Sequence, residues 1–318
     1  MNQEPTVALS ADPRSIDHLT GPEHPERPER FDAVLQGLDQ AGLLDRLKRL
    51  PSRRATREQI ELCHQPEYVD LAEREIAAGA AALSCGDTNV CPASNDVAVL
   101  AAGGVLEAID TVMRNSVRHA FCANRPPGHH ATPTHGMGFC IYNQIAIGAR
   151  YAQARHGVER VLIADWDVHH GNGTQDIFYD DPSVFFFSTH QSPLYPGTGH
   201  AHEKGRGRGE GFTLNCPVPA GSGHAEIVGA FREHLQAAAE TFRPGLVLIS
   251  AGFDSRRGDP LGQLMLSDDD FTELTDIMLG IADEYAGGRL VSVLEGGYAL
   301  TGLASAATAH VTALIDHA

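Results

Sequence analysis

Residues 161–173 read VLIADWDVHHGNG, and this stretch decides the fold class. It begins with a continuous apolar run, Val161 to Ala164, which acidic and imidazole side chains follow at once. Other apolar runs of similar length lie at Ala120 to Ala123, Val184 to Ser188, Leu246 to Ser250 and Leu290 to Leu294. Continuous runs of this kind are typical of strands that are covered on both faces. We therefore predict a buried strand at each run.

Segments with helical periodicity lie between and beside these runs, at residues 94–113, 143–155, 225–242 and 271–285. In residues 225–242, Ile227, Phe231 and Leu235 recur at the spacing of one helix face. Ser267 and Asp270 stand at capping-box spacing before the last segment. The alternation predicts an α/β fold: a single domain over residues 1–318, with a mostly parallel central sheet and helices on both faces.

The chain has 24 Lys plus Arg against 41 Asp plus Glu, a formal net charge of −17. This balance repels phosphate backbones and anionic membranes, so we expect neither nucleic acid nor a membrane as partner. It favours cationic substrates such as lysine-rich peptides or polyamines. The N-terminal residues lack a signal-peptide pattern and no apolar stretch is long enough to span a bilayer, which predicts a cytoplasmic protein.

The cysteines and one glycine-rich segment allow two further predictions. The six cysteines include no C-x-x-C pair, so we expect reduced thiols and no disulfide. Residues 197–211 are rich in glycine and predict a solvated surface loop.

The apolar runs lead into residues that can do chemistry. In chain order these are His129 and His130, then Asp165, Asp167 and His169, then Asp254, then Glu295 and Tyr298. If the strand continues beyond Ala164, Asp165, Asp167 and His169 share one face. Taken singly, each motif is explained by surface decoration, core hydrogen bonding or a tight turn. Because α/β folds bind ligands at the carboxyl ends of their strands, the set together favours a functional site.

Two carboxylates and one imidazole make a three-ligand site with open positions, as in a catalytic zinc site. Such a metal lowers the pKa of bound water toward about 7 and polarises a carbonyl oxygen. His129 and His130 could supply a general base and an acid for the leaving amine, and Tyr298 could donate to the developing oxyanion. Amide hydrolysis requires these functions: an activated water, a polarised carbonyl, proton transfer to the leaving amine and stabilisation of the oxyanion.

The sequence resembles the histone deacetylase superfamily, and within it the class II-like bacterial histone deacetylase-like amidohydrolases. Residues 125–130, 136–140, 165–175, 250–254 and 295–300 carry the resemblance, with lesser matches at 21–30 and 86–94. The resemblance implies an arginase/deacetylase-like fold. It also implies zinc-dependent removal of acetyl-type acyl groups from the side-chain amine of lysine, or from a related amine, by metal-activated water.

By this resemblance, one zinc ion per chain would be held by Asp167, His169 and Asp254. Iron remains an alternative, since a mixed oxygen and nitrogen site accepts several divalent metals. The resemblance also implies a structural potassium ion bound by backbone oxygens near Asp165, Asp167 and His169, together with Ser188.

The resemblance implies a role for each catalytic residue. His130 would be the general base and acid, with His129 as its electrostatic partner, and Tyr298 would polarise the acyl carbonyl. Asp165 would orient His129, and Asn172 would orient His130. Class I members carry Asp at the latter position, so Asn172 marks the class II pattern.

Other residues would contact the substrate. Phe139, next to Gly138, and Tyr195 would flank a narrow tunnel for the aliphatic stem of an acylated lysine. Asp87 would accept backbone N–H groups of a bound peptide, and Arg30 would line an acetate exit channel. Each of these residues could instead serve simple core or loop packing.

Substrate choice depends on Leu261. Relatives that prefer acetylated polyamines carry a glutamate after the Gly-Asp-Pro of this region, whereas residues 258–260 are here followed by Leu261. Burying a second ammonium group without a partner is costly, which favours acyl-lysine or a longer acyl chain. The alternatives are an acetylpolyamine amidohydrolase, an inactive acyl-lysine binding module and a two-metal ureohydrolase of the arginase kind. The natural substrate and the oligomeric state stay open.

Overall fold

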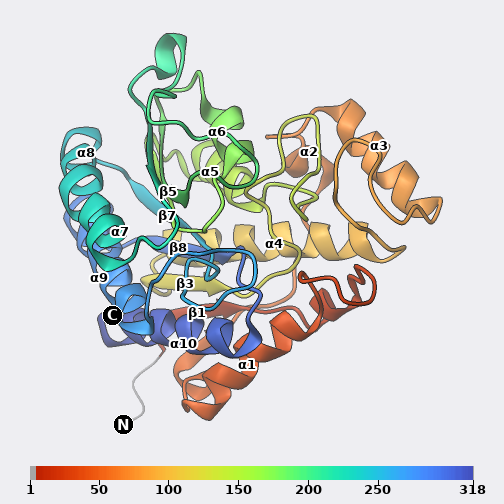
Figure 1. Cartoon of the computed structure of the whole chain (residues 1–318), viewed down its shortest axis with the longest axis horizontal. Helices are drawn as coiled ribbons and strands as arrows, with labels where there is room; N and C mark the ends of the chain where they lie inside the picture. The colour runs from red at the N-terminus through yellow and green to blue at the C-terminus, as the bar shows by residue number, and fades with distance from the viewer. Residues whose placement is uncertain (1–4, 318) are drawn as a thin grey trace.

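One eight-stranded parallel sheet forms the centre of the structure, a computed structural model that describes residues 5–317 (Figure 1). The strand order is β2-β1-β3-β8-β7-β4-β5-β6, and every neighbouring pair is parallel. The strands are β1 (Val7–Ser10), β2 (Leu47–Arg49), β3 (His119–Cys122), β4 (Val161–Asp165), β5 (Val184–Gln191), β6 (Thr213–Val218), β7 (Leu246–Ala251) and β8 (Leu290–Leu294).

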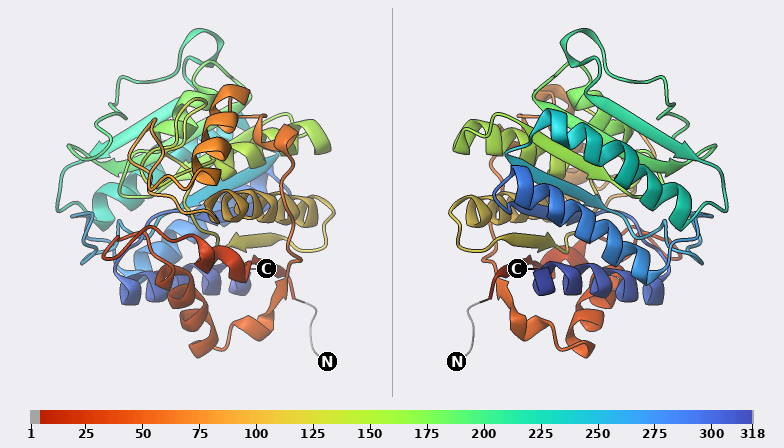
Figure 2. Two further views of the ribbon diagram at one scale, coloured as in Figure 1. Left: turned by 90° about the vertical axis from the view of Figure 1, so that its right-hand side faces the viewer. Right: turned by 90° about the vertical axis from the view of Figure 1, so that its left-hand side faces the viewer.

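Helices cover both faces of this sheet, as the two views of Figure 2 show. Helices α1 and α7 to α10 lie on one face, and α3 to α5 lie on the other. The α-helices are α1 (Glu29–Gln40), α2 (Arg57–Ile60), α3 (Pro66–Ala77), α4 (Ser94–Met113), α5 (Gln144–His156), α6 (Asn172–Phe178), α7 (His224–Ala230), α8 (Gln236–Phe242), α9 (Asp268–Tyr285) and α10 (Leu300–His317). Short helical turns are η1 (Pro13–Asp17), η2 (Leu44–Arg46), η3 (Gly207–Gly209) and the π-helical η4 (Phe231–Leu235).

The central strands are apolar throughout because both of their faces are buried. In β4, Leu162 and Ala164 enter the core beneath α7 to α10, whereas Val161 and Ile163 enter the core beneath α4 and α5. All four side chains are fully buried. The two cores follow from the alternation of side chains along a strand, and they fix the register of the sheet.

The sequence-based prediction of fold class is confirmed. Each predicted apolar run is a strand, and each predicted helical segment is helical to within a few residues. Residues 225–242 form α7, η4 and α8 in unbroken succession, so the expected helix contains a π-helical turn. Before α9, the Asp270 carboxylate accepts the backbone N–H and the hydroxyl of Ser267, at 2.7 and 2.8 Å. Strands β1, β2 and β6 were not predicted.

The glycine-rich segment 197–211 is more ordered than a purely solvated loop. It contains η3, and the Glu203 carboxylate accepts hydrogen bonds from the Gln175 amide at 2.7 Å and from the Gly199 backbone at 3.1 Å. The six cysteines are free thiols, as expected. Within residues 5–317, no helix combines the length and the apolar character that crossing a membrane requires.

Candidate active site

The carboxyl ends of four neighbouring strands bring distant segments together. Strands β3, β8, β7 and β4 are adjacent in the sheet. The segments that leave them, residues 123–130, 295–298, 252–254 and 166–170, therefore meet at one edge. This is the edge where open α/β sheets bind ligands.

Three of the predicted site residues form a compact buried cluster. The ligand atoms of Asp167, His169 and Asp254 all lie within 4.8 Å of one another. The His169 Nδ1 atom is 3.0 Å from Asp167 Oδ1 and 3.3 Å from Asp254 Oδ2. Backbone N–H groups hold the carboxylates in place: Val168 donates to Asp254 at 2.8 Å, and Gly296 donates to Asp167 at 2.8 Å.

Strand β4 ends at Asp165, so the condition under which Asp165, Asp167 and His169 would share one strand face is not met. Asp165 Oδ1 accepts the backbone N–H of Asp167 at 3.1 Å, and Asp167 Oδ1 accepts that of His169 at 2.9 Å. Aspartate side chains that bond the backbone two residues on favour turns over a strand ladder. Because of this turn, the Asp165 side chain lies against His129, whereas the Asp167 and His169 side chains lie beside Asp254.

The cluster fits a divalent cation. Among the described residues, the buried Asp254 Oδ2 atom has no hydrogen-bond partner, although such oxygens are normally satisfied. Two glycines leave space around the carboxylates: a Cβ on Gly252 would lie 2.1 Å from Asp167 Oδ2, and one on Gly296 would lie 2.0 Å from Asp254 Oδ2. Two carboxylates and one imidazole are a donor set suited to zinc, with iron as a chemical alternative.

Two histidines stand beside the cluster, each fixed by a different partner. The His129 Nδ1 atom lies 2.9 Å from Asp165 Oδ2, and the His130 Nδ1 atom lies 2.8 Å from Asn172 Oδ1. The two imidazole rings are 4.0 Å apart. A neutral His130 that donates from Nδ1 to the amide oxygen keeps its Nε2 lone pair free.

The two histidines have opposite pKa shifts. Burial by itself lowers the pKa of His129, but the negative charges of Asp165 and Asp167 outweigh burial and hold that pKa well above its usual value. Burial also lowers the pKa of His130, and the positive charge of His129 lowers it further. The pair therefore combines a charged imidazole with a neutral one.

Tyr298 is held at the mouth of the cluster through its backbone and its ring. The Asp259 carboxylate accepts the Tyr298 backbone N–H at 2.7 Å, and the Arg30 guanidinium lies 4.8 Å from the centre of the ring. Burial raises the pKa of Tyr298 well above its ordinary value, and the charge of Asp254 adds to this effect. The phenol is therefore a hydrogen-bond donor at neutral pH.

A cavity of about 280 Å³ leads to these groups. Its lining residues are Asp87, His130, Gly138, Phe139, His169, Leu194, Tyr195, Leu261 and Tyr298. The Phe139 and Tyr298 rings are 5.9 Å apart, and the Tyr195 and His130 rings are 5.1 Å apart. Five residues predicted to contact the substrate thus border one cavity: Asp87, Gly138, Phe139, Tyr195 and Leu261. Arg30, predicted to line an exit channel, is fully buried and is not among the residues that line this cavity.

Two of the lining residues also have roles within the chain. The Asp87 carboxylate accepts the backbone N–H of Gly138 at 2.7 Å, so one of its oxygens is already used. Gly138 has φ +55°, and a Cβ there would lie 2.2 Å from the His130 ring. Glycine at this position therefore allows the close approach of the loop to the imidazole.

Sequence reasoning did not assign roles to Glu295 and Asp259. Glu295 Oε2 accepts the backbone N–H groups of Gly128 and His129 at 2.6 and 3.1 Å, which fixes the turn that carries both histidines. Asp259 was considered only within the Gly-Asp-Pro of residues 258–260, without its role in holding the Tyr298 backbone. The position of Glu295 directly after a buried strand was the one available signal.

Comparisons with known proteins agree with this architecture. A family model described as the histone deacetylase domain matches residues 24–314. A histone deacetylase-like amidohydrolase of Pseudomonas aeruginosa is 40% identical over 86% of this chain and 72% of its own length. The human polyamine deacetylase HDAC10 is 42% identical over 91% of this chain, which spans only 44% of that relative. The crystal structure of the HDA15 HD domain has a TM-score of 0.93 at 36% identity, covering 99% of this chain and 89% of that one.

The fold and the buried cluster define a parallel α/β protein with a candidate metal centre at the carboxyl edge of its sheet. The chain belongs to the histone deacetylase family.

Proposed function

We propose that residues 1–318 form a single zinc-dependent amidohydrolase domain that removes acetyl-type groups from the side-chain amine of lysine or from a related amine. One observation carries this proposal: the cavity that Phe139 and Tyr195 border is also lined by the buried His130, His169 and Tyr298. A narrow cavity with aromatic walls suits an aliphatic stem whose amide reaches the polar end.

Asp167, His169 and Asp254 would hold the zinc ion. A divalent cation in that position supplies Lewis acidity toward the amide carbonyl and lowers the pKa of a water molecule. His130, oriented by Asn172, would accept a proton at Nε2 and deliver it to the departing amine.

Tyr298 would donate its phenolic hydrogen to the carbonyl oxygen as negative charge develops there. The imidazolium of His129, held by Asp165, would stabilise that charge electrostatically. Asp87, Gly138 and Leu261 would contact the rest of the substrate near the mouth of the cavity. We further propose a structural potassium ion near Ser188 and a cytoplasmic location.

Tyr298→Phe tests the proposed chemistry. The variant should keep zinc and fold but lose roughly 10²–10³-fold in turnover of an acetyl-lysine peptide, the usual effect of deleting one oxyanion donor. Tyr179→Phe, at the end of α6 and outside the cavity lining, is the matched control and should keep full turnover. Unchanged turnover in Tyr298→Phe contradicts the proposed role.

An acetylpolyamine substrate is the second candidate, because one relative is a polyamine deacetylase by name. Leu261 borders the cavity and gives a second ammonium group no ion pair. Leu261→Glu should therefore raise the ratio of acetylspermidine turnover to acetyl-lysine turnover, whereas Leu261→Gln, of similar size, should not. A wild-type protein that already prefers acetylspermidine overturns the lysine assignment.

Metal analysis separates the remaining candidates. One tightly bound zinc per chain with turnover supports the amidohydrolase, and two manganese ions support a ureohydrolase. One zinc without turnover of any acylated amine supports a binding module. Iron found in place of zinc corrects the metal and leaves the rest of the proposal standing.

A further inference from the structure

A row of arginines crosses the edge of the sheet opposite the candidate active site. Arg118, Arg289 and Arg160 each directly precede a strand, β3, β8 and β4 respectively, and Arg243 lies just before β7. These four strands are neighbours. Backbone bonds confirm the alignment: Leu290 N–H donates to Arg118 at 3.3 Å, and Gly245 N–H donates to Arg160 at 2.8 Å.

Three of these arginines are not neutralised by carboxylates. Arg118 pairs with Asp283 at 3.0 Å. Within the part of the chain that the structure describes, Arg160, Arg243 and Arg289 form no ion pair.

These three arginines line one cavity of about 400 Å³. The Arg160 Nε atom donates to the Arg243 carbonyl at 3.0 Å, which holds the two residues together. The Arg289 Nε atom is buried and has no hydrogen-bond partner among the described residues. Glu159 also lines the cavity, as does His156, whose Nε2 lies 2.6 Å from Asp110.

The conformation of Arg243 supports a role for its side chain. It caps α8 with φ +52°, a left-handed conformation in which glycine is the favoured residue. The backbone conformation of this cap therefore does not explain why the residue is an arginine. Its guanidinium lies 5.6 Å from the centre of the Tyr285 ring, within the range of a cation–π contact.

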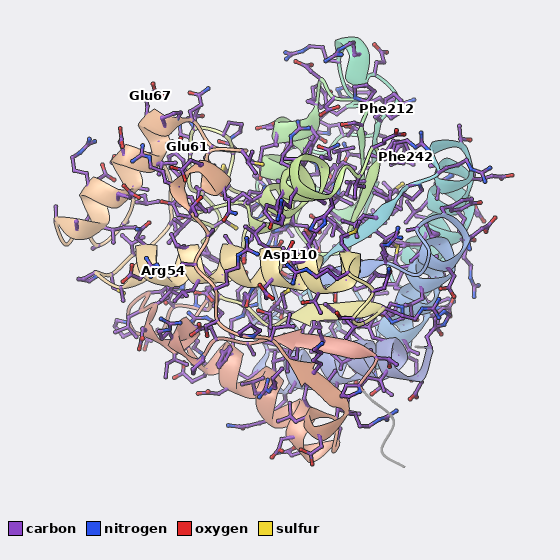
Figure 3. The ribbon with its side chains drawn as sticks, turned by 180° about the vertical axis from the view of Figure 1, so that it is seen from behind. Arg54, Glu61, Glu67, Asp110, Phe212 and Phe242 are labelled. Carbon is purple, nitrogen blue, oxygen red and sulfur yellow. The ribbon has the colours of Figure 1, made fainter. Side chains whose placement is uncertain are left out.

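A second cavity of about 760 Å³ shares Arg160 and Arg243 with the first. Its apolar wall includes Phe185, Phe212 and Phe242. Figure 3 labels the last two, Phe212 just before β6 and Phe242 at the end of α8. The Phe212 and Phe242 rings are 5.9 Å apart, and Phe185 lies 5.6 Å from Phe242. Lys204 and Glu210 also line this cavity. An aromatic wall therefore adjoins a group of unpaired cations.

We propose that these two cavities, which share Arg160 and Arg243, together bind a nucleoside polyphosphate. Its phosphates accept hydrogen bonds from Arg160, Arg243 and Arg289, since guanidinium forks match phosphate oxygens. Its base contacts Phe212 and Phe242, because every base offers a π-face to an aromatic side chain. The site lies at the amino ends of β4, β7 and β8, whereas the candidate active site lies at their carboxyl ends.

Isothermal titration of the full chain with ADP, pyrophosphate and adenosine tests this proposal. ADP should bind saturably, pyrophosphate at least tenfold more weakly, and adenosine more weakly still. The double variant Arg160→Gln/Arg289→Gln should lose at least tenfold in affinity for ADP and for pyrophosphate. Phe212→Ala should weaken ADP by roughly tenfold and leave pyrophosphate unchanged.

Arg54→Gln is the matched control, since this exposed arginine pairs with Asp96 and lines neither cavity. It should bind all three ligands as the wild type does. If the double variant has a lowered melting temperature, Arg289→Lys provides a second test. It keeps the positive charge but removes the bidentate guanidinium, and it should still lower the affinity for pyrophosphate. Three results overturn the proposal: no saturable ADP binding, ADP affinity undiminished in the arginine variants, or equal affinity for ADP and pyrophosphate.

Discussion

The substitution Gly296→Ala tests whether the buried cluster binds a metal ion. A Cβ at this position would lie 2.0 Å from Asp254 Oδ2 and 2.6 Å from Asp167 Oδ2, whereas real Cβ contacts essentially never fall below 3.0 Å. One carboxylate oxygen must therefore move by about 1 Å. Metal sites tolerate ligand displacements of about 0.2 Å. Both carboxylates are fully buried, so they have little room to adjust elsewhere.

We expect Gly296→Ala to lower zinc affinity by 10–100-fold, which corresponds to a loss of about 1.4–2.8 kcal/mol in binding free energy. Turnover should fall accordingly. Zinc content after dialysis against a graded chelator measures the first effect, and hydrolysis of an acetyl-lysine peptide measures the second. Gly280→Ala is the matched control, because a Cβ at this exposed position in α9 meets no atom within 4 Å. It should keep its zinc and gain about 0.5–1 kcal/mol of stability. A folded Gly296→Ala protein with wild-type zinc affinity refutes the assignment of these carboxylates as ligands.

Two further predictions concern stability. Burial lowers the pKa of His310 to about 3 and that of His64 to about 4, so both are neutral in the folded protein and protonate more readily in the unfolded chain. Their contribution is complete above pH ~6.5 and declines as the pH falls toward the folded pKa values, by about 2 kcal/mol for each histidine at pH 5. Urea unfolding at pH 7.5 and pH 5 should show this loss, and His310→Leu should reduce it; an equal loss in that variant contradicts the assignment. Asp270→Ala should cost about 1–2 kcal/mol, because Asp270 accepts hydrogen bonds from Ser267 and from His224. Asp269→Ala, at the exposed neighbouring position, should change the free energy of unfolding by no more than about 0.5 kcal/mol, and equal effects would show that the cap does not stabilise α9.

The sequence predicts the central strands because burial on both faces demands continuous apolar residues. It does not reveal β2, whose Lys48 and Arg49 are exposed at the edge of the sheet, or β6, where Pro217 interrupts the strand pattern. Strand β1 offers only three consecutive apolar residues, Val7 to Leu9, a shorter run than Ala120 to Ala123, which revealed β3. Short and edge strands are specified by their neighbours more than by their own residues.

In the candidate active site, too, the sequence reveals some features and not others. The order of residues after each strand identifies Asp167, His169 and Asp254 as candidates, since parallel strands end at one edge. The turn after Asp165 was missed because it depends on side chains bonding the backbone two residues on. The support that Glu295 gives to the histidine turn joins segments far apart in the chain, and no local pattern encodes such a contact.

The place of β8 in the sheet has a consequence for synthesis on the ribosome. This strand is the last to be made, yet it lies between β3 and β7 at the middle of the sheet. Until it has emerged, the nascent chain holds two half-sheets whose inner edges are unpaired and open to other chains. Chains that terminate early, before about residue 290, should therefore depend heavily on chaperones, whereas loss of the edge strand β2 should be far better tolerated.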